Sequence, residues 1–222
     1  MAFDRDAMLR AWQQLELSSR GPVLGIGTGT TVEALCAVAC QENLFPENKT
    51  VVASSIRTQK FLSTLEVDSV LMAHVSRLDL YIDGVDQIDS DWVCLKGGGG
   101  AMTGEKICAN MADDFIAVYA KEKEVDTLVS SMALPVEVVS WAQSSLGREI
   151  VKMGGKPILR DKKSELGNPI VDCYGLSFAA ACKLEGDIGK LCGVIEHGLF
   201  AERRPDRALV IDGAEIADKG RQ

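Results

Sequence analysis

Short apolar runs alternate with helix-like segments through the first half of the chain, and this alternation constrains the fold more than any other feature. Five runs are compact and lack the polar alternation of a half-exposed strand: residues 22–27, 49–55, 78–84, 91–97 and 114–120. Helical patterns separate them at residues 30–43, 56–66 and 104–113. Strands covered on both faces and joined by helices are typical of a parallel sheet between helical layers. The first half therefore predicts an α/β sheet domain.

The second half has a different texture from about Ser130. Short apolar runs at residues 156–161, 169–175 and 192–200 flank two helix-like segments. This order predicts a smaller α+β domain, and we expect the strand-like tail, residues 207–220, to return to the first sheet. The predicted architecture has these two parts: a Rossmann-like parallel-sheet domain of residues 1–129 and 203–222, and a ferredoxin-like α+β domain of residues 130–202.

Charge and hydropathy exclude several classes of function. The net charge of −8 argues against binding to nucleic acid or to an anionic membrane, because both need clustered Lys and Arg. No segment has the roughly 18 uninterrupted apolar residues of a membrane span. Residues 1–17 form an amphipathic helix pattern with acids near its start, without the basic and apolar regions of a signal peptide. We therefore expect a cytoplasmic protein.

The cysteine and histidine content argues against disulfides and zinc. The seven cysteines are odd in number, include no CxxC pair and mostly lie in apolar runs, which indicates small buried side chains in a reducing compartment. With only His74 and His197 besides, a structural zinc site is not expected. The chemistry is expected to depend on carboxylates and lysine.

The segment GIGTGTT, residues 25–31, is the first candidate site. It follows a predicted strand and opens a predicted helix, so its amides and the helix dipole could hold an anion. It does not fit G-x-G-x-x-G, and no acidic residue ends the next strand, which weakens a dinucleotide interpretation. Thr28, Thr30 and Thr31 could donate to phosphate oxygens. The alternative, a glycine-rich turn with Thr as the helix N-cap, stays equally open.

The segment DGVDQIDSD, residues 83–91, is the second candidate site. It lacks the spacing and the final Glu of a calcium loop. Asp83 and Asp86 follow an apolar run, at the carboxyl end of a predicted strand, where ligands of open α/β sheets bind. Two neighbouring carboxylates push their pKa values apart, so that one can carry a proton while the other acts as a base. Asp89 and Asp91 are interpreted as residues of a solvated turn.

The segment KGGGGAMTGE, residues 96–105, is the third. Four successive glycines carry a large entropic cost and give a core no side chain, so a close approach of backbone to ligand explains them best. Lys96 could steady a phosphate or an oxyanion. Glu105 falls in the first turn of the next helix, where the dipole favours its charged form. A surface glutamate is the alternative for Glu105 alone, but the three segments together favour a catalytic site.

These segments resemble ribose-5-phosphate isomerase of the A type. GIGTGTT is similar to the family pattern G-x-G-T-G-S/T-T, DGVDQ to DGADE, and KGGGGAMTGEK to KGGGA-x-x-x-EK with the same interval between lysine and glutamate. Three later segments, LPVEVV, GNPIVDCYG and GVIEHGLF, also resemble the family. The likeness runs from about residue 5 to the C-terminal strand.

The resemblance implies a two-domain enzyme that interconverts aldose and ketose pentose 5-phosphates without a metal or other cofactor, commonly as a homodimer or tetramer. It implies that Glu105 is the general base, that Asp83 and Asp86 assist ring opening and proton movement, and that Lys96 stabilises the intermediate. It also implies that the smaller domain acts as a lid or in oligomerisation. The substrate contacts implied in the same way are Gly27, Thr28, Gly29, Thr30, Thr31, Ser54, Ser55, Gly97, Gly98, Gly99 and Lys123.

The chain departs from the family pattern at three positions. Gln87 stands in place of the glutamate of DGADE, and we expect it to keep an orienting role. Ala7 stands in place of a lysine in the first helix, and Arg10 is the candidate to replace the phosphate contact of that lysine. Ala120 stands in place of an aspartate. Two other functions remain open: an amino-sugar-phosphate deaminase, which commonly uses a catalytic His, and a non-catalytic sugar-phosphate sensor.

Overall fold

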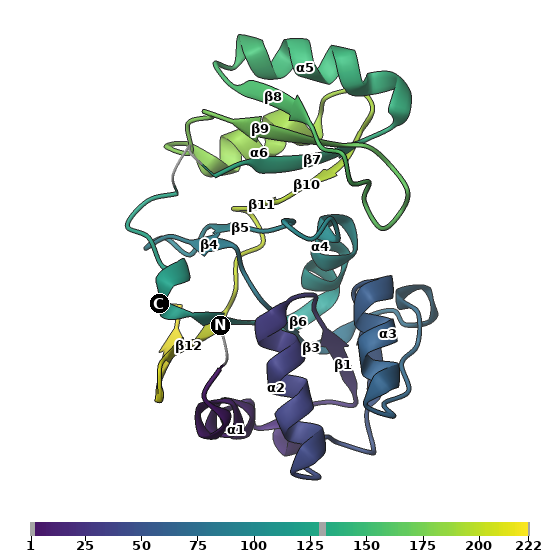
Figure 1. The fold of residues 1–222 in the computed structure, drawn as a ribbon, viewed down its shortest axis with the longest axis vertical. Helices are drawn as coiled ribbons and strands as arrows, with labels where there is room; N and C mark the ends of the chain where they lie inside the picture. Colours follow the sequence, from purple (N-terminus) through teal and green to yellow (C-terminus); the bar gives the residue numbers. More distant parts are fainter. Residues whose placement is uncertain (1–2, 129–131, 222) are drawn as a thin grey trace. The chain divides into compact units, whose positions relative to one another are not determined.

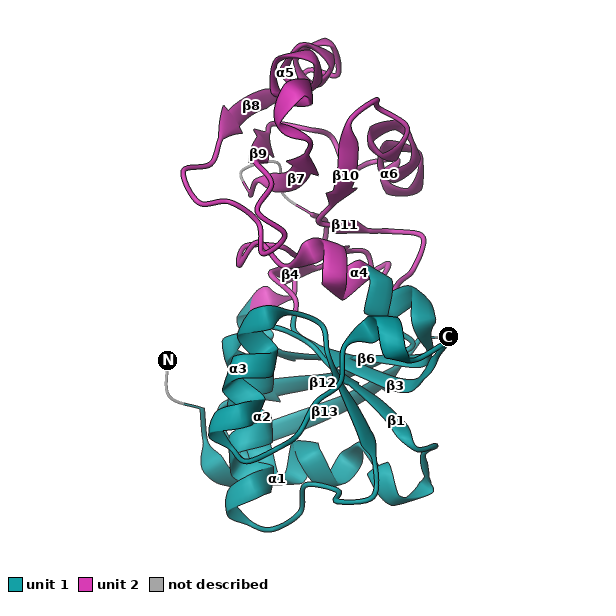
Figure 2. Ribbon diagram, turned by 90° about the vertical axis from the view of Figure 1, so that its right-hand side faces the viewer, with its two compact units in different colours: residues 1–84, 107–122, 205–222 teal, residues 85–106, 123–204 magenta. Residues whose placement is uncertain are grey.

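The structure is a computed structural model that describes residues 3–128 and 132–221. The chain divides into two compact units, coloured in Figure 2. Unit 1 comprises Met1–Gly84, Ile107–Glu122 and Pro205–Gln222, and unit 2 comprises Val85–Lys106 and Lys123–Arg204. The expected boundary at residues 129/130 lies outside the described residues. Unit 2 also takes in residues 85–106, whereas the sequence assigned them to the parallel-sheet domain.

Unit 1 is built on a six-stranded sheet (Figure 1). Its strands in spatial order are β13 (Glu215–Gly220), β12 (Arg207–Asp212), β6 (Ala112–Ala120), β3 (Leu78–Asp83), β1 (Val23–Ile26) and β2 (Thr50–Ala53). All neighbours are parallel except β13, which pairs antiparallel with β12. The prediction of a Rossmann-like parallel sheet is confirmed. The C-terminal run does return to this sheet, as a hairpin rather than as one strand.

Capping side chains mark the start of some helices of unit 1. The helix α1 (Arg5–Gln14) is capped by Asp4, whose carboxylate accepts from the Ala7 amide at 2.8 Å. The helices α2 (Thr30–Gln41) and α3 (Ile56–Thr64) follow β1 and β2. Short 3-10 turns lie at Leu17–Ser19 and Met72–His74. One apolar core joins α1 and α2 to the sheet through side chains that include Trp12, Leu35 and Ile82.

Unit 2 contains a four-stranded antiparallel sheet with two helices. Its spatial order is β10 (Val194–His197), β7 (Leu134–Val138), β9 (Ile170–Tyr174) and β8 (Lys156–Leu159). The 3-10 turn η4 (Ser140–Ala142) and the helix α5 (Gln143–Lys152) join β7 to β8, and α6 (Ala181–Gly189) joins β9 to β10. The chain order βαββαβ is that of a ferredoxin-like fold, which confirms this prediction.

The run at residues 91–97 was expected as a strand of the main sheet, and that assignment is wrong. Only β5 (Cys94–Leu95) forms, between β4 (Gln87–Ile88) and β11 (Leu199–Phe200) in a separate antiparallel sheet of unit 2. The strand β5 is short because a tight turn precedes it and the glycines follow it. In that turn, Asp89 Oδ1 accepts from the Asp91 and Val93 amides at 3.0 and 2.9 Å. Asp89 is a turn residue, as expected.

Two elements extend across the division of the chain. The helix α4 (Met102–Met111) begins in unit 2 and ends in unit 1, and the 3-10 turn η3 (Lys121–Lys123) does the reverse. Within residues 3–128 and 132–221, no helix has the length and apolar character needed to cross a bilayer.

Candidate active site

The glycine-rich turn after β1 is fixed to its neighbours in unit 1 by backbone and side-chain bonds. The Gly27 amide donates to Ile82 O at 2.7 Å, and the Thr58 hydroxyl donates to Gly27 O at 2.9 Å. A Cβ at Gly27 would lie only 2.0 Å from Asp83 Oδ1. Only glycine therefore fits at this position without moving the carboxylate.

Asp83 is a fully buried carboxylate at the end of β3. Its Oδ1 accepts from the Thr28 amide at 3.0 Å and from the Gly84 amide at 2.7 Å. Its Oδ2 accepts from the Tyr81 hydroxyl at 2.6 Å. The desolvation cost of the charge is offset by these three donors. Asp83 consequently orients the Thr28 backbone as well as presenting a carboxylate at the strand end.

Four hydroxyl groups gather beside this turn in unit 1. Thr28 Oγ1 lies 3.1 Å from Ser54 Oγ, 2.7 Å from Ser55 Oγ and 3.0 Å from Thr58 Oγ1. Ser55 also caps α3, because its Oγ accepts from the Thr58 amide at 3.0 Å. A hydroxyl can donate to an anionic oxygen while accepting from a neighbour. Thr58 was not expected here, since it falls inside a helix pattern that gives no signal for a site.

The start of α2 corrects the expectation that Thr is its N-cap. Gly29 is the N-cap residue, and the helix begins at Thr30. Gly29 has no side chain to accept from the first-turn amides, and a helix start of this kind can bind an anion. Thr30 and Thr31 stand in that first turn, beside Thr28 in the chain. Unit 1 thus brings the expected Thr and Ser contacts together around one turn.

In unit 2, Asp86 stands just before the β4–β5 hairpin. Its amide donates to Leu95 O at 2.8 Å, which ties its backbone to β5. Its Oδ2 accepts from the Gly98 amide at 2.9 Å. Asp86 is therefore oriented directly by the glycine loop, residues 97–100.

The glycine loop itself is a turn that only glycine tolerates at its ends. Gly97 and Gly100 have φ values of +92° and +82°, in the region that disfavours other residues. The Gly100 amide donates to Gly97 O at 3.0 Å. Gly98 and Gly99 are exposed, and a Cβ at Gly99 would meet no atom within 4 Å. The loop therefore presents bare backbone at Gly98 and Gly99.

Lys96 and Glu105 form a buried ion pair in unit 2. Lys96 Nζ lies 3.2 Å from Glu105 Oε2, and the side chains are 3% and 5% exposed. The Lys96 amide donates to Gly198 O at 2.8 Å, and its ammonium lies 5.7 Å from the centre of the Phe200 ring. A Cβ at Gly198 would come within 2.0 Å of Lys96 O, so the bend between β10 and β11 also needs glycine. The predicted lysine and carboxylate are thus brought together.

A second buried lysine, Lys106, was not singled out from the sequence. Its ammonium donates to Glu185 Oε1 at 3.0 Å, Glu196 Oε1 at 2.9 Å and Leu199 O at 2.8 Å. It lies 3.3 Å from His197 Nδ1. Because Lys106 follows Glu105 in the chain, this network fixes the first turns of α4 within unit 2. The only sequence signal was the EK pair itself.

The remaining expected residues are placed as follows. Lys123 ends η3 in unit 2 and is half-buried. Gln87 is buried in β4. Arg10 donates to Ala214 O in the turn between β12 and β13. Among the described residues, no three His, Cys, Asp or Glu side chains gather as metal ligands.

No cysteine belongs to the hydroxyl cluster of unit 1 or to the ion pair of Lys96 and Glu105 in unit 2. All seven are free; four of them are buried, as the sequence predicted, whereas Cys182 and Cys192 are exposed. Burial raises the pKa of the Cys36 thiol, and it raises that of Cys173 to about 12. Thiols that stay protonated are poor nucleophiles, so these two are packing residues.

Comparison with known proteins identifies the family of this chain. The family model for ribose 5-phosphate isomerase A (phosphoriboisomerase A) matches residues 50–215. A ribose-5-phosphate isomerase A from Francisella tularensis subsp. tularensis is 38% identical over 188 residues, 84% of this chain and 83% of the relative. A crystal structure of ribose 5 phosphate isomerase A from Neisseria gonorrhoeae has 30% identity and a TM-score of 0.89, covering 99% of both chains.

A further solved structure carries a ligand. It is D-ribose-5-phosphate isomerase in complex with phospho-erythronic acid, at 25% identity and a TM-score of 0.89 over 100% of both chains. The family match covers well over half of this chain, and the identity to the curated relative extends over most of both proteins. The chain belongs to the ribose 5-phosphate isomerase A family.

Proposed function

We propose that this chain interconverts D-ribose 5-phosphate and D-ribulose 5-phosphate through an enediolate, with Glu105 as the carboxylate base. As a member of its family, the chain is an enzyme of the aldose–ketose isomerase class. The observation that carries the mechanism is the buried pair of Lys96 and Glu105, 3.2 Å apart in unit 2. A base beside a fixed cation is what a reaction through an oxyanion requires.

The proton transfers can be written with these residues alone. The Glu105 carboxylate takes the proton from C2 of the open-chain aldose, the C–H electrons form the C1–C2 double bond, and the carbonyl oxygen at C1 becomes the oxyanion. Glu105 then returns the proton to C1, while the hydroxyl at C2 loses its proton and becomes the ketone. Asp86 moves the proton between the two oxygens, and Lys96 stabilises the oxyanion.

The second part of the proposal is that residues of unit 1 bind the phosphate. Thr28, Ser54 and Ser55 supply neighbouring hydroxyls, and α2 supplies the amides of a helix start. Asp83 assists ring opening, and its bond to the Thr28 amide supports a role in holding the turn. Lys123, Thr30, Thr31 and the glycines Gly27, Gly29, Gly97, Gly98 and Gly99 complete the proposed contacts.

The ligand of one relative supports this substrate class. Phospho-erythronic acid, which is bound in that relative, is a phosphorylated sugar acid, and it joins a phosphate to a carboxylate. A carboxylate has two adjacent charged oxygens, much as an enediolate has. A site that accepts such a ligand fits an isomerase of sugar phosphates.

The proposal extends to the setting of the enzyme. Family membership favours a homodimer and a place in the non-oxidative branch of the pentose phosphate pathway. Family membership also favours a cytoplasmic location. We propose that residues 130–202 act as a lid or in oligomerisation, and that the catalytic residues come from residues 1–129 and 203–222, a range that the structure divides between its two units. Neither metal nor cofactor enters the proposed steps.

The test is conversion of ribose 5-phosphate to ribulose 5-phosphate in the presence of a chelator. Wild type should turn over at its full rate, and Glu105→Gln should lose about 10²-fold or more in kcat, the effect of a positioned base. Wild-type activity that disappears with chelator would overturn the metal-free mechanism. Release of ammonia from glucosamine 6-phosphate would favour the deaminase alternative, and binding without any turnover would favour the sensor.

A further inference from the structure

Arg160 is a partly buried arginine that has no role in the isomerisation steps proposed above. It follows β8, and its backbone amide donates to Ile170 O at 2.9 Å. Its guanidinium binds Asp172 of β9 in a bidentate manner, with Nε to Oδ2 at 2.8 Å and Nη2 to Oδ1 at 2.5 Å. The two side chains are 18% and 14% exposed. Asp172 therefore holds the guanidinium plane in one orientation.

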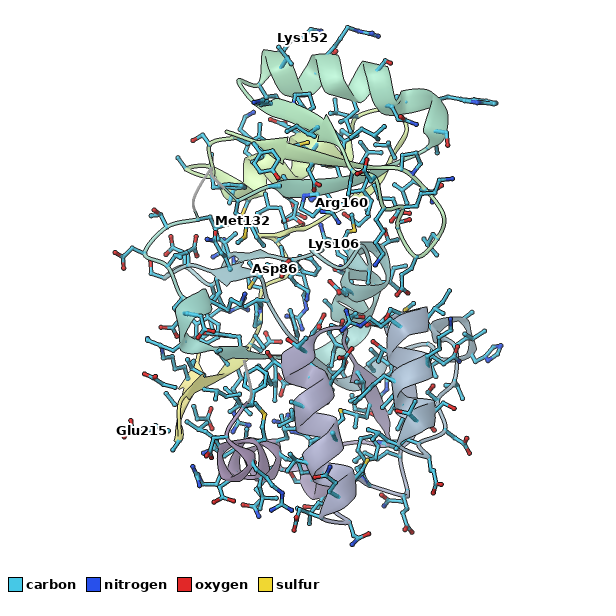
Figure 3. The ribbon with its side chains drawn as sticks, viewed as in Figure 1. Asp86, Lys106, Met132, Lys152, Arg160 and Glu215 are labelled. Carbon is cyan, nitrogen blue, oxygen red and sulfur yellow. The ribbon has the colours of Figure 1, made fainter. Side chains whose placement is uncertain are left out.

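The third nitrogen of that guanidinium reaches the glycine loop. Arg160 Nη1 donates to Gly97 O at 3.1 Å and to Gly98 O at 3.3 Å. Both carbonyls belong to the loop whose Gly98 amide donates to Asp86 Oδ2 at 2.9 Å. All of these residues lie in unit 2, and Figure 3 labels Arg160 and Asp86 among its side chains.

Peptide geometry couples the two ends of this arrangement. The Gly97 carbonyl and the Gly98 amide belong to one peptide group, and no described peptide bond is cis. In a planar trans peptide the C=O and the N–H point in opposite directions. A donor that fixes Gly97 O on one side therefore aims the Gly98 N–H on the other side, toward Asp86.

The glycine loop needs hydrogen bonds from residues outside it, because its own sequence supplies little rigidity. A glycine loses more conformational freedom on ordering than any other residue, and four of them stand in succession here. Gly98 and Gly99 are exposed, so packing does not hold them. Besides the bond inside the turn, the Glu165 amide donates to Gly100 O at 3.1 Å. Arg160 is the side chain that holds the other end.

We propose that Arg160 is a positioning residue of the isomerase, which acts through the Gly97–Gly98 peptide on Asp86 and is itself oriented by Asp172. The inference rests on the proposed function for its effect on turnover, but its effect on the loop does not depend on that function. Arg160 touches no reacting atom in this arrangement. Its substitution changes where Asp86 points, and it leaves the groups of unit 1 unaltered.

The chain offers a matched control in Arg207 of unit 1. Arg207 also binds an aspartate in a bidentate manner, through Nε to Asp218 Oδ1 at 2.7 Å and Nη2 to Asp218 Oδ2. It donates to a backbone carbonyl as well, Gln14 O at 2.8 Å, and its side chain is 20% exposed. It therefore makes the same kinds of bond without contacting the glycine loop.

The kinetic test compares Arg160→Ala, Asp172→Asn and Arg207→Ala in the isomerisation of ribose 5-phosphate. We expect kcat of Arg160→Ala to fall by about 10- to 100-fold, the cost of a misplaced catalytic group, with KM changed by less than about threefold. Asp172→Asn should follow it with a smaller loss, and added guanidinium should restore part of the Arg160→Ala rate. Arg207→Ala should keep the wild-type kcat. Equal kcat in Arg160→Ala and Arg207→Ala would overturn the proposal.

A second measurement separates this proposal from the proposed function. Hydrogen exchange at the Gly98 amide is followed in the folded proteins without substrate, and we expect it to be at least about tenfold faster in Arg160→Ala than in wild type or Arg207→Ala. Unchanged exchange at Gly98 would overturn the positioning role even if turnover fell. Faster exchange in a chain whose wild type turns over no sugar phosphate would support the positioning of Asp86 while refuting the isomerase function.

Discussion

Lys96 Nζ lies 3.2 Å from Glu105 Oε2 in an ion pair that is almost completely withdrawn from solvent. Loss of one partner removes a counter-ion from a buried charge, which costs about 3–5 kcal/mol. Lys96→Met should therefore reduce the free energy of unfolding by about that amount, and it should also abolish most of the turnover because the oxyanion loses its cation. Urea denaturation and initial rates measure the two effects separately.

The double variant Lys96→Met with Glu105→Gln serves as the control for this prediction. It removes both charges, so it should regain a good part of the stability that Lys96→Met loses, while its activity should stay at the level of Glu105→Gln. If the double variant were less stable than Lys96→Met, the ion pair would not be the source of the stability loss.

Thr58 is expected to organise the hydroxyl cluster of unit 1. Its hydroxyl donates to Gly27 O at 2.9 Å and lies 3.0 Å from Thr28 Oγ1. Thr58→Val keeps the shape but leaves the Gly27 carbonyl without this donor, so we expect stability to fall by about 1–2 kcal/mol. KM for ribose 5-phosphate should rise by about 3- to 10-fold with little change in kcat, because the substitution weakens phosphate binding rather than the proton transfer.

Thr64 provides the matched control for Thr58. It stands at the end of the same helix and donates to Phe61 O at 2.6 Å, but it is exposed. Thr64→Val should leave KM unchanged. A KM equal to that of wild type in both variants would argue against a role of the Thr58 hydroxyl in substrate binding.

Gly27→Ala tests the close approach of the β1 turn to Asp83. The new Cβ would lie 2.0 Å from Asp83 Oδ1 and 2.1 Å from its Cγ, so the carboxylate or the turn has to move. We expect a loss of stability of about 1–3 kcal/mol and a raised KM. Gly186→Ala in α6 is the control, since its Cβ would meet nothing closer than Lys190 Nζ at 3.9 Å. It should gain about 0.5–1 kcal/mol without any change in kinetics.

The sequence predicted the parts of this protein that depend on local pattern. The parallel strands of unit 1 were predictable because both of their faces are buried, which gives a continuous apolar run such as the one at Leu78–Asp83. The pairing of Lys96 with Glu105 followed from a strand end, a glycine turn and a helix start in succession. Asp83 ends β3, where the sequence placed it, and the catalytic roles of Asp83 and Asp86 stay predictions.

Other contacts depend on long-range pairing that no local pattern encodes. The pairing of β8 with β9 brings Arg160 to Asp172, and Arg160 also reaches Gly97 O across 63 positions of sequence. Lys106 meets partners 79 to 93 residues away. The run at residues 91–97 was assigned to the wrong sheet because a short apolar run has the same sequence pattern in a parallel sheet as in an antiparallel one.

His197 makes the stability of the protein depend on pH in a definite direction. The side chain is 2% exposed, and burial, followed by the charge of Lys106, lowers its pKa from 6.5 to about 3; the bond to the Glu185 carbonyl opposes this shift. Below pH 6.5 the unfolded chain binds a proton at His197 that the folded chain does not bind until about pH 3. The free energy of unfolding should therefore fall as the pH decreases through that interval.

The size of the effect follows from the slope of about 1.4 kcal/mol per pH unit for one proton. Between pH 7 and pH 5, wild type should lose about 2 kcal/mol more than His197→Gln, whose side chain does not titrate. The carboxylates of Glu185 and Glu196 and the ammonium of Lys106 remain in both proteins, so their contribution largely cancels in the difference. Urea denaturation at the two pH values measures each loss, and equal losses in wild type and His197→Gln would show that His197 takes up its proton in the folded state as well.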